Sequence, residues 1–117
     1  MSPQQHERWQ VKHWVLLVLS SAQKEQATDL VIGPSTGVGT SIRYKIAGDW
    51  HDWAPAPGLA WPLVASELGG LAGIRDVPFP KEGIIYLAYS GIRLRWRIQM
   101  QSLDGQGVLQ NLGSEIV

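Results

Sequence analysis

Apolar and polar residues alternate without interruption from Ile92 to Met100, and this pattern predicts a β-strand with two different faces. Side chains of a strand point alternately to opposite sides of a sheet. The outward face would carry Arg93, Arg95 and Arg97, followed by Gln99. The core-facing residues would be Ile92, Leu94, Trp96, Ile98 and Met100. Guanidinium groups bind carboxylates and phosphates through paired donors, so the arginine row is a candidate contact surface, although a merely solvated strand face has the same pattern.

Two other segments have the spacing of amphipathic helices. From about residue 5 to 26, apolar residues recur three, four and seven positions apart, which predicts a helix packed against a sheet. Its apolar residues are Val11, Trp14, Val15, Val18 and Ala22, with Trp9, Leu16 and Leu19 beside them. A second helix is expected from 59 to about 74, with Pro62 in its first turn and with Gly69 and Gly70 weakening its end.

Five further strands complete an order of helix, three strands, helix and three strands. They are expected at 29–32, 39–46, 50–53, 84–89 and 108–112. Gly48-Asp49 marks one turn, and Ser90-Gly91 is a two-residue hairpin signal. Antiparallel hairpins with helices packed on one face of the sheet define an α+β domain.

Length and charge limit the possible functions. The 117 residues suffice for one domain with a single core, and 10 Lys and Arg balance 10 Asp and Glu. A general nucleic-acid binder would need a basic surplus, so nucleic acid is not the expected partner. A local nucleic-acid site on the arginine row is an alternative, and salt-dependent binding would reveal it.

In the segment 39–46, Arg43 and Lys45 share the face opposite Ile42 and Tyr44, and they could extend the arginine surface from a neighbouring strand.

No membrane span is expected, because no apolar stretch reaches the roughly 18–20 residues that cross a bilayer. Residues 14–19 are apolar after Lys12 and His13, but this run is too short for the core of a typical signal peptide, and Glu7 precedes it. We therefore favour a buried first helix and a cytoplasmic location.

Catalytic chemistry has weak support. The chain has no cysteine, which excludes disulfides and thiol catalysis. His6 and His13 would lie two helical turns apart, too far for one metal ion. His51 and Asp52 could form a base with its orienting carboxylate, but no nucleophile is placed beside them. The loop 33–41 resembles a phosphate loop without its lysine. We expect no catalytic residue, no metal and no cofactor.

The order of motifs resembles the second N-terminal domain of the bacterial secretion ATPases that drive type II secretion and type IV pilus assembly. That family has A-S-D-I-H-I-E-P where this chain has A-T-D-L-V-I-G-P at 27–34, and V-R-Y-R-I-D-G where it has I-R-Y-K-I-A-G at 42–48. Its pattern S-R-L-K-x-L-A-G-L corresponds to S-E-L-G-G-L-A-G-I at 66–74. Its P-Q-D-G-R-I corresponds to P-K-E-G-I-I at 80–85, and its D-x-R-V-S to R-W-R-I-Q at 95–99. The match runs from about residue 15 to 112.

The resemblance implies a PAS-like antiparallel sheet with helices on one face. In the family, arginines of this domain contact nucleotide phosphates bound by the catalytic domain, and Arg97 matches one of them. Ile84 stands where the G-R-I motif has its arginine, and Gln106 and Gly107 replace the Glu and Arg of a closing G-E-R turn. No Walker motif occurs within these residues, so we expect a stand-alone relative.

The resemblance and the residue pattern together lead to one main hypothesis. The chain would be a non-catalytic interaction or adaptor module, with a protein partner such as a secretion or pilus assembly ATPase. Phosphate or partner contacts would come from Arg43, Lys45, Arg93, Arg95 and Arg97. The alternative is a PAS-like sensor holding a small ligand between sheet and helix, in a pocket lined by some of the six tryptophans.

Overall fold

The predicted order of helices and strands is confirmed by the computed structural model, which describes residues 3–35, 39–53, 58–102 and 104–116. The elements are α1 (Pro3–Lys24), β1 (Asp29–Pro34), β2 (Thr40–Ile46), β3 (Asp49–Asp52), α2 (Trp61–Leu71), β4 (Lys81–Tyr89), β5 (Ile92–Met100) and β6 (Gly107–Ile116). The strands β4 and β6 are longer than predicted, because each continues through polar residues that interrupt the apolar pattern.

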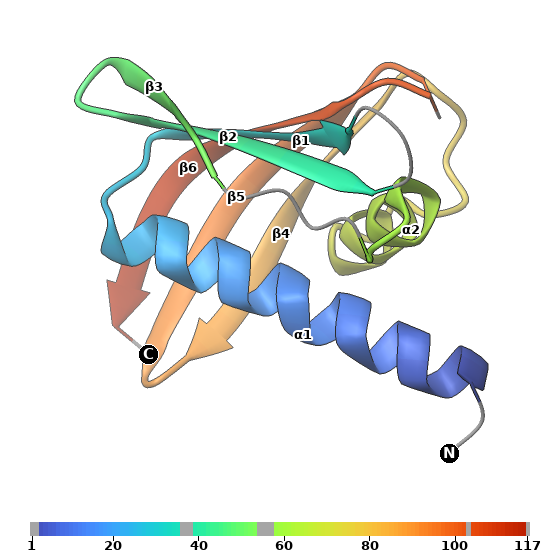
Figure 1. The fold of residues 1–117 in the computed structure, drawn as a ribbon. Helices are drawn as coiled ribbons and strands as arrows, with labels where there is room; N and C mark the ends of the chain where they lie inside the picture. Colours follow the sequence, from blue (N-terminus) through green and yellow to red (C-terminus); the bar gives the residue numbers. More distant parts are fainter. Residues whose placement is uncertain (1–2, 36–38, 54–57, 103, 117) are drawn as a thin grey trace.

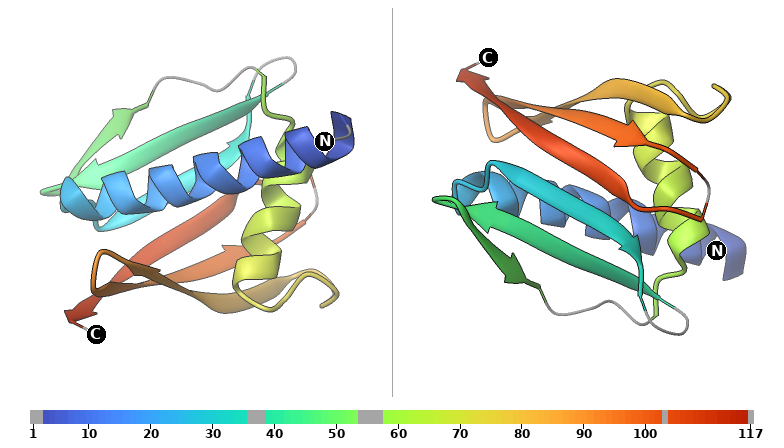
Figure 2. Two further views of the ribbon diagram at one scale, coloured as in Figure 1. Left: turned by 90° about the horizontal axis from the view of Figure 1, so that it is seen from below. Right: turned by 90° about the horizontal axis from the view of Figure 1, so that it is seen from above.

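The six strands form one antiparallel sheet in the order β3-β2-β1-β6-β5-β4. Both helices lie on the same face of this sheet, with α1 running across it and α2 near β4 (Figures 1 and 2). The α+β prediction is therefore confirmed. The first and last strands meet at the centre, where β1 pairs with β6 from Asp29↔Gln110 to Ile32↔Gly107. The opposite face, which we call the outer face, carries no described helix (Figure 2, right).

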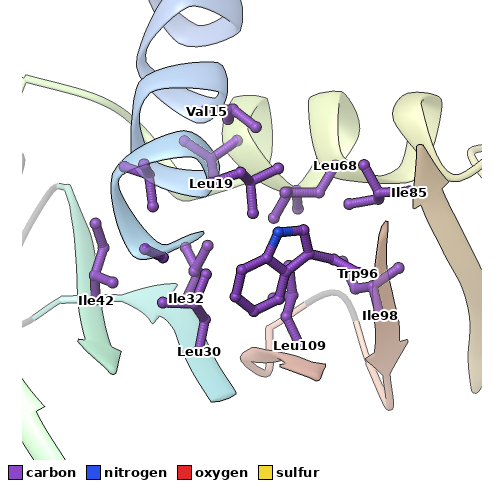
Figure 3. Packing of buried hydrophobic residues seen from close by; sticks show 14 of the residues in the cluster. Val15, Leu19, Leu30, Ile32, Ile42, Leu68, Ile85, Trp96, Ile98 and Leu109 are labelled. Carbon is purple, nitrogen blue, oxygen red and sulfur yellow. The ribbon is translucent and has the colours of Figure 1, made fainter. Parts of the chain in front are cut away.

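The core fills the space between the helices and the sheet. Trp96 of β5 is fully buried near the middle of this layer, among side chains of both helices and of the sheet (Figure 3). The other large side chains with almost no exposure include Val15, Leu19, Leu30, Ile32, Ile42, Leu68, Ile85, Ile98 and Leu109. Among the described residues, the indole Nε1 of Trp96 has no hydrogen-bond partner. Packing rather than polar anchoring therefore holds this ring.

The predicted apolar face of α1 is confirmed from Val11 onward and wrong at Trp9. Val15, Val18 and Ala22 are buried beneath the sheet. Trp9 is 56% exposed, because the first turns of α1 project past the sheet (Figure 1). A helix that is longer than the layer it covers leaves its terminal apolar residues without a sheet partner.

Two tight turns join neighbouring strands. The predicted Ser90-Gly91 hairpin is confirmed, with φ of 49° and 77°. The other turn lies one residue earlier than predicted, at Ala47-Gly48, with φ of 51° and 87°, and Asp49 already pairs with Ile46. Positive φ at both central residues is typical of the two-residue turns that match the twist of a hairpin.

Thr40 shows how the connection before α2 is held to the sheet. Its side chain is fully buried, and its hydroxyl donates to the carbonyl oxygen of Leu59 at 2.8 Å. We expect Thr40→Val, which keeps the shape but removes this bond, to lower the free energy of unfolding by about 1–2 kcal/mol, because the carbonyl of Leu59 loses its donor. Urea unfolding measures the loss. Ser41→Ala, at a partly exposed neighbour, is the control and should change stability by less than about 0.5 kcal/mol; an equal loss would contradict the assignment.

Neither helix of the described residues combines the length and the apolar character needed to cross a bilayer.

Candidate functional site

The two faces of β5 divide as its sequence predicts. Leu94, Trp96, Ile98 and Met100 are buried on the helix side. Ile92 was predicted to join them, but it is 37% exposed because it lies at the hairpin end of the strand. Arg93, Arg95 and Arg97 point to the outer face, directly opposite Ala88, Tyr86 and Ile84 of β4. The arginine row therefore runs along the face without a described helix.

Carboxylates from the neighbouring strands compensate this row. Arg93 Nη1 lies 3.1 Å from Glu115 Oε1 of β6, and Arg97 Nε lies 3.8 Å from Glu82 Oε1 of β4. Arg95 Nη2 donates to the carbonyl oxygen of Leu112 at 3.2 Å. Exposed pairs of this kind contribute little to stability. Their effect is on binding, because a phosphate would have to compete with carboxylates already in place.

Arg43 and Lys45 share the outer face but not the neighbourhood of the arginine row. The expectation that their strand adjoins β5 is wrong, since β1 and β6 lie between β2 and β5. Three strand spacings separate the two groups by about 14 Å. Arg43 Nε lies 3.3 Å from Asp52 Oδ1, and the cationic groups of Arg43 and Lys45 lie 5.4 and 5.8 Å from the ring centroid of Trp50.

Exposed apolar side chains lie between and beside these charges. Tyr86 is 57% exposed opposite Arg95, and Trp50 is 42% exposed opposite Lys45. Val31 of β1 and Val108 of β6 are paired between them on the same face. The sequence pattern did not reveal Tyr86, because the unbroken apolar run 84–89 hides the alternation of the strand. The outer face thus combines aromatic, aliphatic and paired charged groups.

The residues considered for catalysis do not come together. His51 and Asp52 are successive residues of β3, so their side chains point to opposite faces: the His51 ring stacks on Tyr44 at 5.3 Å, and Asp52 pairs with Arg43. Asp52 therefore does not orient the imidazole. The phosphate-loop resemblance falls on the hairpin connection between β1 and β2, where Pro34 pairs with Thr40 and no helix follows; residues 36–38 of that loop lie outside the described residues.

No group of three or more His, Asp or Glu side chains within the described ranges could hold a metal ion. The side chain of His6 lies outside the described residues, and His13 stacks on Trp9 with ring centroids 5.2 Å apart.

In comparisons with known proteins, no family model and no curated protein matches this chain.

Proposed function

We propose that the chain is a non-catalytic interaction or adaptor module that binds a partner protein through the outer face of its sheet. One observation carries this proposal: a six-stranded sheet has an entire face without a described helix, and exposed Tyr86 and Trp50 lie on it beside arginines. Tyr86 and Trp50 lie on the two edge strands, β4 and β3, and the pair Val31–Val108 lies between them. Exposed apolar groups surrounded by polar ones are typical of protein-interaction sites.

The charge pattern favours a protein over a nucleic acid or a free phosphate. Trp, Tyr and Arg carry most of the binding energy in protein interfaces. The ion pairs Arg93–Glu115, Arg97–Glu82 and Arg43–Asp52 present both signs of charge within one surface. Mixed charges of this kind orient a partner and exclude wrong ones, whereas phosphate binding requires a local positive excess.

We further propose a PAS-like fold and a secretion or pilus assembly ATPase as the partner, in the cytoplasm. The motifs that resemble the secretion ATPase domain fall on regular elements, at β1, β2, α2, β4 and β5. Arg97, which matches a phosphate-contacting arginine of that family, lies on the outer face beside Glu82. A single antiparallel sheet with its helices on one face is the arrangement that the resemblance implies.

The packing of the interior favours this function over the sensing of a ligand between sheet and helix. Trp96, Leu19 and Leu30 fill the space between α1 and the sheet, each with no measurable exposure. A ligand at that position would have to displace them (Figure 3).

The test compares two variants with equal exposure on opposite sides of the molecule. Tyr86 is 57% exposed on the outer face, and Leu17 is 56% exposed on α1. We expect Tyr86→Ala to weaken binding to the partner ATPase at least tenfold, because truncating an aromatic anchor of an interface typically costs about 2 kcal/mol or more. Affinity capture with the purified chain, followed by titration of the recovered ATPase, measures the change.

The control variant Leu17→Ala should bind as the unchanged chain does, and both variants should unfold at similar urea concentrations because neither side chain is buried. Recovery of no secretion or pilus ATPase, or equal binding by the two variants, would contradict the proposal.

A further inference from the structure

A hollow opens between the two helices, on the side of the molecule opposite the outer face. Its volume is about 510 Å³, within the range of sites that hold small molecules. The first half of α1, the exposed side of α2 and Arg75 beyond the end of α2 form its walls. We call it the α1–α2 hollow.

Three cations surround this hollow. Arg8 and Lys12 are one helical turn apart on α1, so their side chains share a face, and Arg75 lies across from them. Glu67 is the one acidic residue among the described residues of the lining. Among the described residues, none of the three cations forms an ion pair, in contrast to Arg93 and Arg97 on the outer face. Among the described residues of the lining, three positive charges against one negative charge leave a local surplus of two.

Arg75 is held in place by α2. Its Nε donates to the carbonyl oxygen of Ser66 at 3.1 Å. Its guanidinium group lies so close to Gly70 that a Cβ there would overlap Nη2 and come within 2.8 Å of Cζ. The glycine that weakens this helix therefore leaves room for the guanidinium group against α2.

The hollow also has apolar walls. Trp9 is largely exposed, Leu63 is exposed at the start of α2, and Val11 is a buried residue of the lining. His13 stacks on the indole of Trp9 with an interplanar angle of 4° and restricts the ring. Exposed tryptophan beside uncompensated cations favours a ligand that is both apolar and anionic.

We propose that the α1–α2 hollow binds a small aromatic anion carrying two negative charges, with its ring against Trp9 and Leu63 and its anionic group between Arg8, Lys12 and Arg75. This site is independent of the outer face, so either proposal can fail without the other.

The first experiment measures binding of 1-naphthyl phosphate to the full chain by isothermal titration calorimetry. Uncharged 1-naphthol, which has the same ring, is the matched probe. We expect the phosphate to bind at least tenfold more tightly than the naphthol, because several cations contact its anionic group. We also expect its affinity to fall as salt rises from 50 to 500 mM, since the site is open to solvent.

Three variants locate the site. The double variant Arg8→Ala, Lys12→Ala should weaken binding roughly tenfold or more. Gly70→Ala should weaken it roughly threefold or more by displacing Arg75, while the thermal midpoint stays the same or rises, because alanine favours a helix. Arg75→Ala should also weaken binding, because it removes the same cation without adding a methyl group at position 70. Arg97→Ala removes a cation from the outer face and should leave binding unchanged.

Three results would overturn the proposal. They are equal binding of 1-naphthol and its phosphate, absence of binding at millimolar concentration, and equal weakening by Arg97→Ala and by the double variant. Loss of affinity in Gly70→Ala and Arg75→Ala, with folded protein in both, would support it.

Discussion

Trp96→Ala is expected to lower the free energy of unfolding by about 3–5 kcal/mol, because removing a large ring from a fully buried site leaves a cavity and loses its packing contacts. Trp96 has 0% exposure and lies among side chains from both helices and the sheet (Figure 3). The whole free energy of unfolding of a domain of this size is typically only about 5–15 kcal/mol. Urea unfolding monitored by far-ultraviolet circular dichroism measures the difference.

Two further tryptophan variants separate the causes of this loss. Trp50→Ala, at a 42% exposed site on the outer face, should cost less than about 1 kcal/mol. Trp96→Phe should cost clearly less than Trp96→Ala, since it keeps an aromatic ring and removes an indole N–H that has no partner among the described residues. Equal costs for Trp96→Phe and Trp96→Ala would contradict the assignment of this site to packing.

Asn111→Ala is expected to lower the free energy of unfolding by about 2–4 kcal/mol, because it removes three hydrogen bonds at once. The Nδ2 of Asn111 donates to Gln23 Oε1 at 2.8 Å and to the carbonyl oxygen of Ala27 at 2.9 Å. Its Oδ1 accepts from the backbone N–H of Gly113 at 2.7 Å. The side chain thus ties the end of α1 to β6, beside the register shift between β5 and β6. Urea unfolding again measures the loss.

Asn111→Asp separates the two sides of this link. The aspartate keeps an acceptor for Gly113 but cannot donate to Ala27, so we expect it to remain destabilised by more than about 1 kcal/mol. The neighbouring exposed variant Gln110→Ala is the control and should be near neutral. If Asn111→Ala were as stable as Gln110→Ala, these three bonds would not hold the helix to the sheet.

The parts of the fold that could be predicted from sequence are those with one buried face. The alternation in β5 and the helical spacing of α1 arise because each buries one side against the other, and burial dictates where apolar residues occur. The Ser90-Gly91 hairpin was predictable for a different reason. Two-residue turns need positive φ, which glycine adopts more readily than other residue types, so a glycine between two strands indicates such a turn.

The parts that could not be predicted depend on residues far apart in the chain. Glu82 and Glu115 reach the arginine row only because β4 and β6 flank β5, and nothing local in the sequence states that order. The separation of Arg43 from the row has the same origin, because β1 and β6 come between. The expected contact surface was therefore placed on the correct face, but its charge balance and its extent were not predictable.

Gly70 illustrates a third limit. The low helix propensity of glycine predicts only a weak helix end at this position. In the structure, the absence of a side chain at Gly70 also leaves room for the guanidinium group of Arg75, which follows after a turn. A glycine can be required for close approach by another group, and intrinsic propensity carries no information about that group.

The most direct test of this account concerns the two faces of the sheet. Nuclear magnetic resonance with a dissolved paramagnetic agent measures which groups solvent reaches. The account predicts strong broadening of the Arg97 Nε–H, the Trp50 indole N–H and the Val108 methyl signals, with the Trp96 indole N–H unaffected. Broadening of the Trp96 signal, or protection of Arg97 and Val108 in the isolated chain, would contradict it.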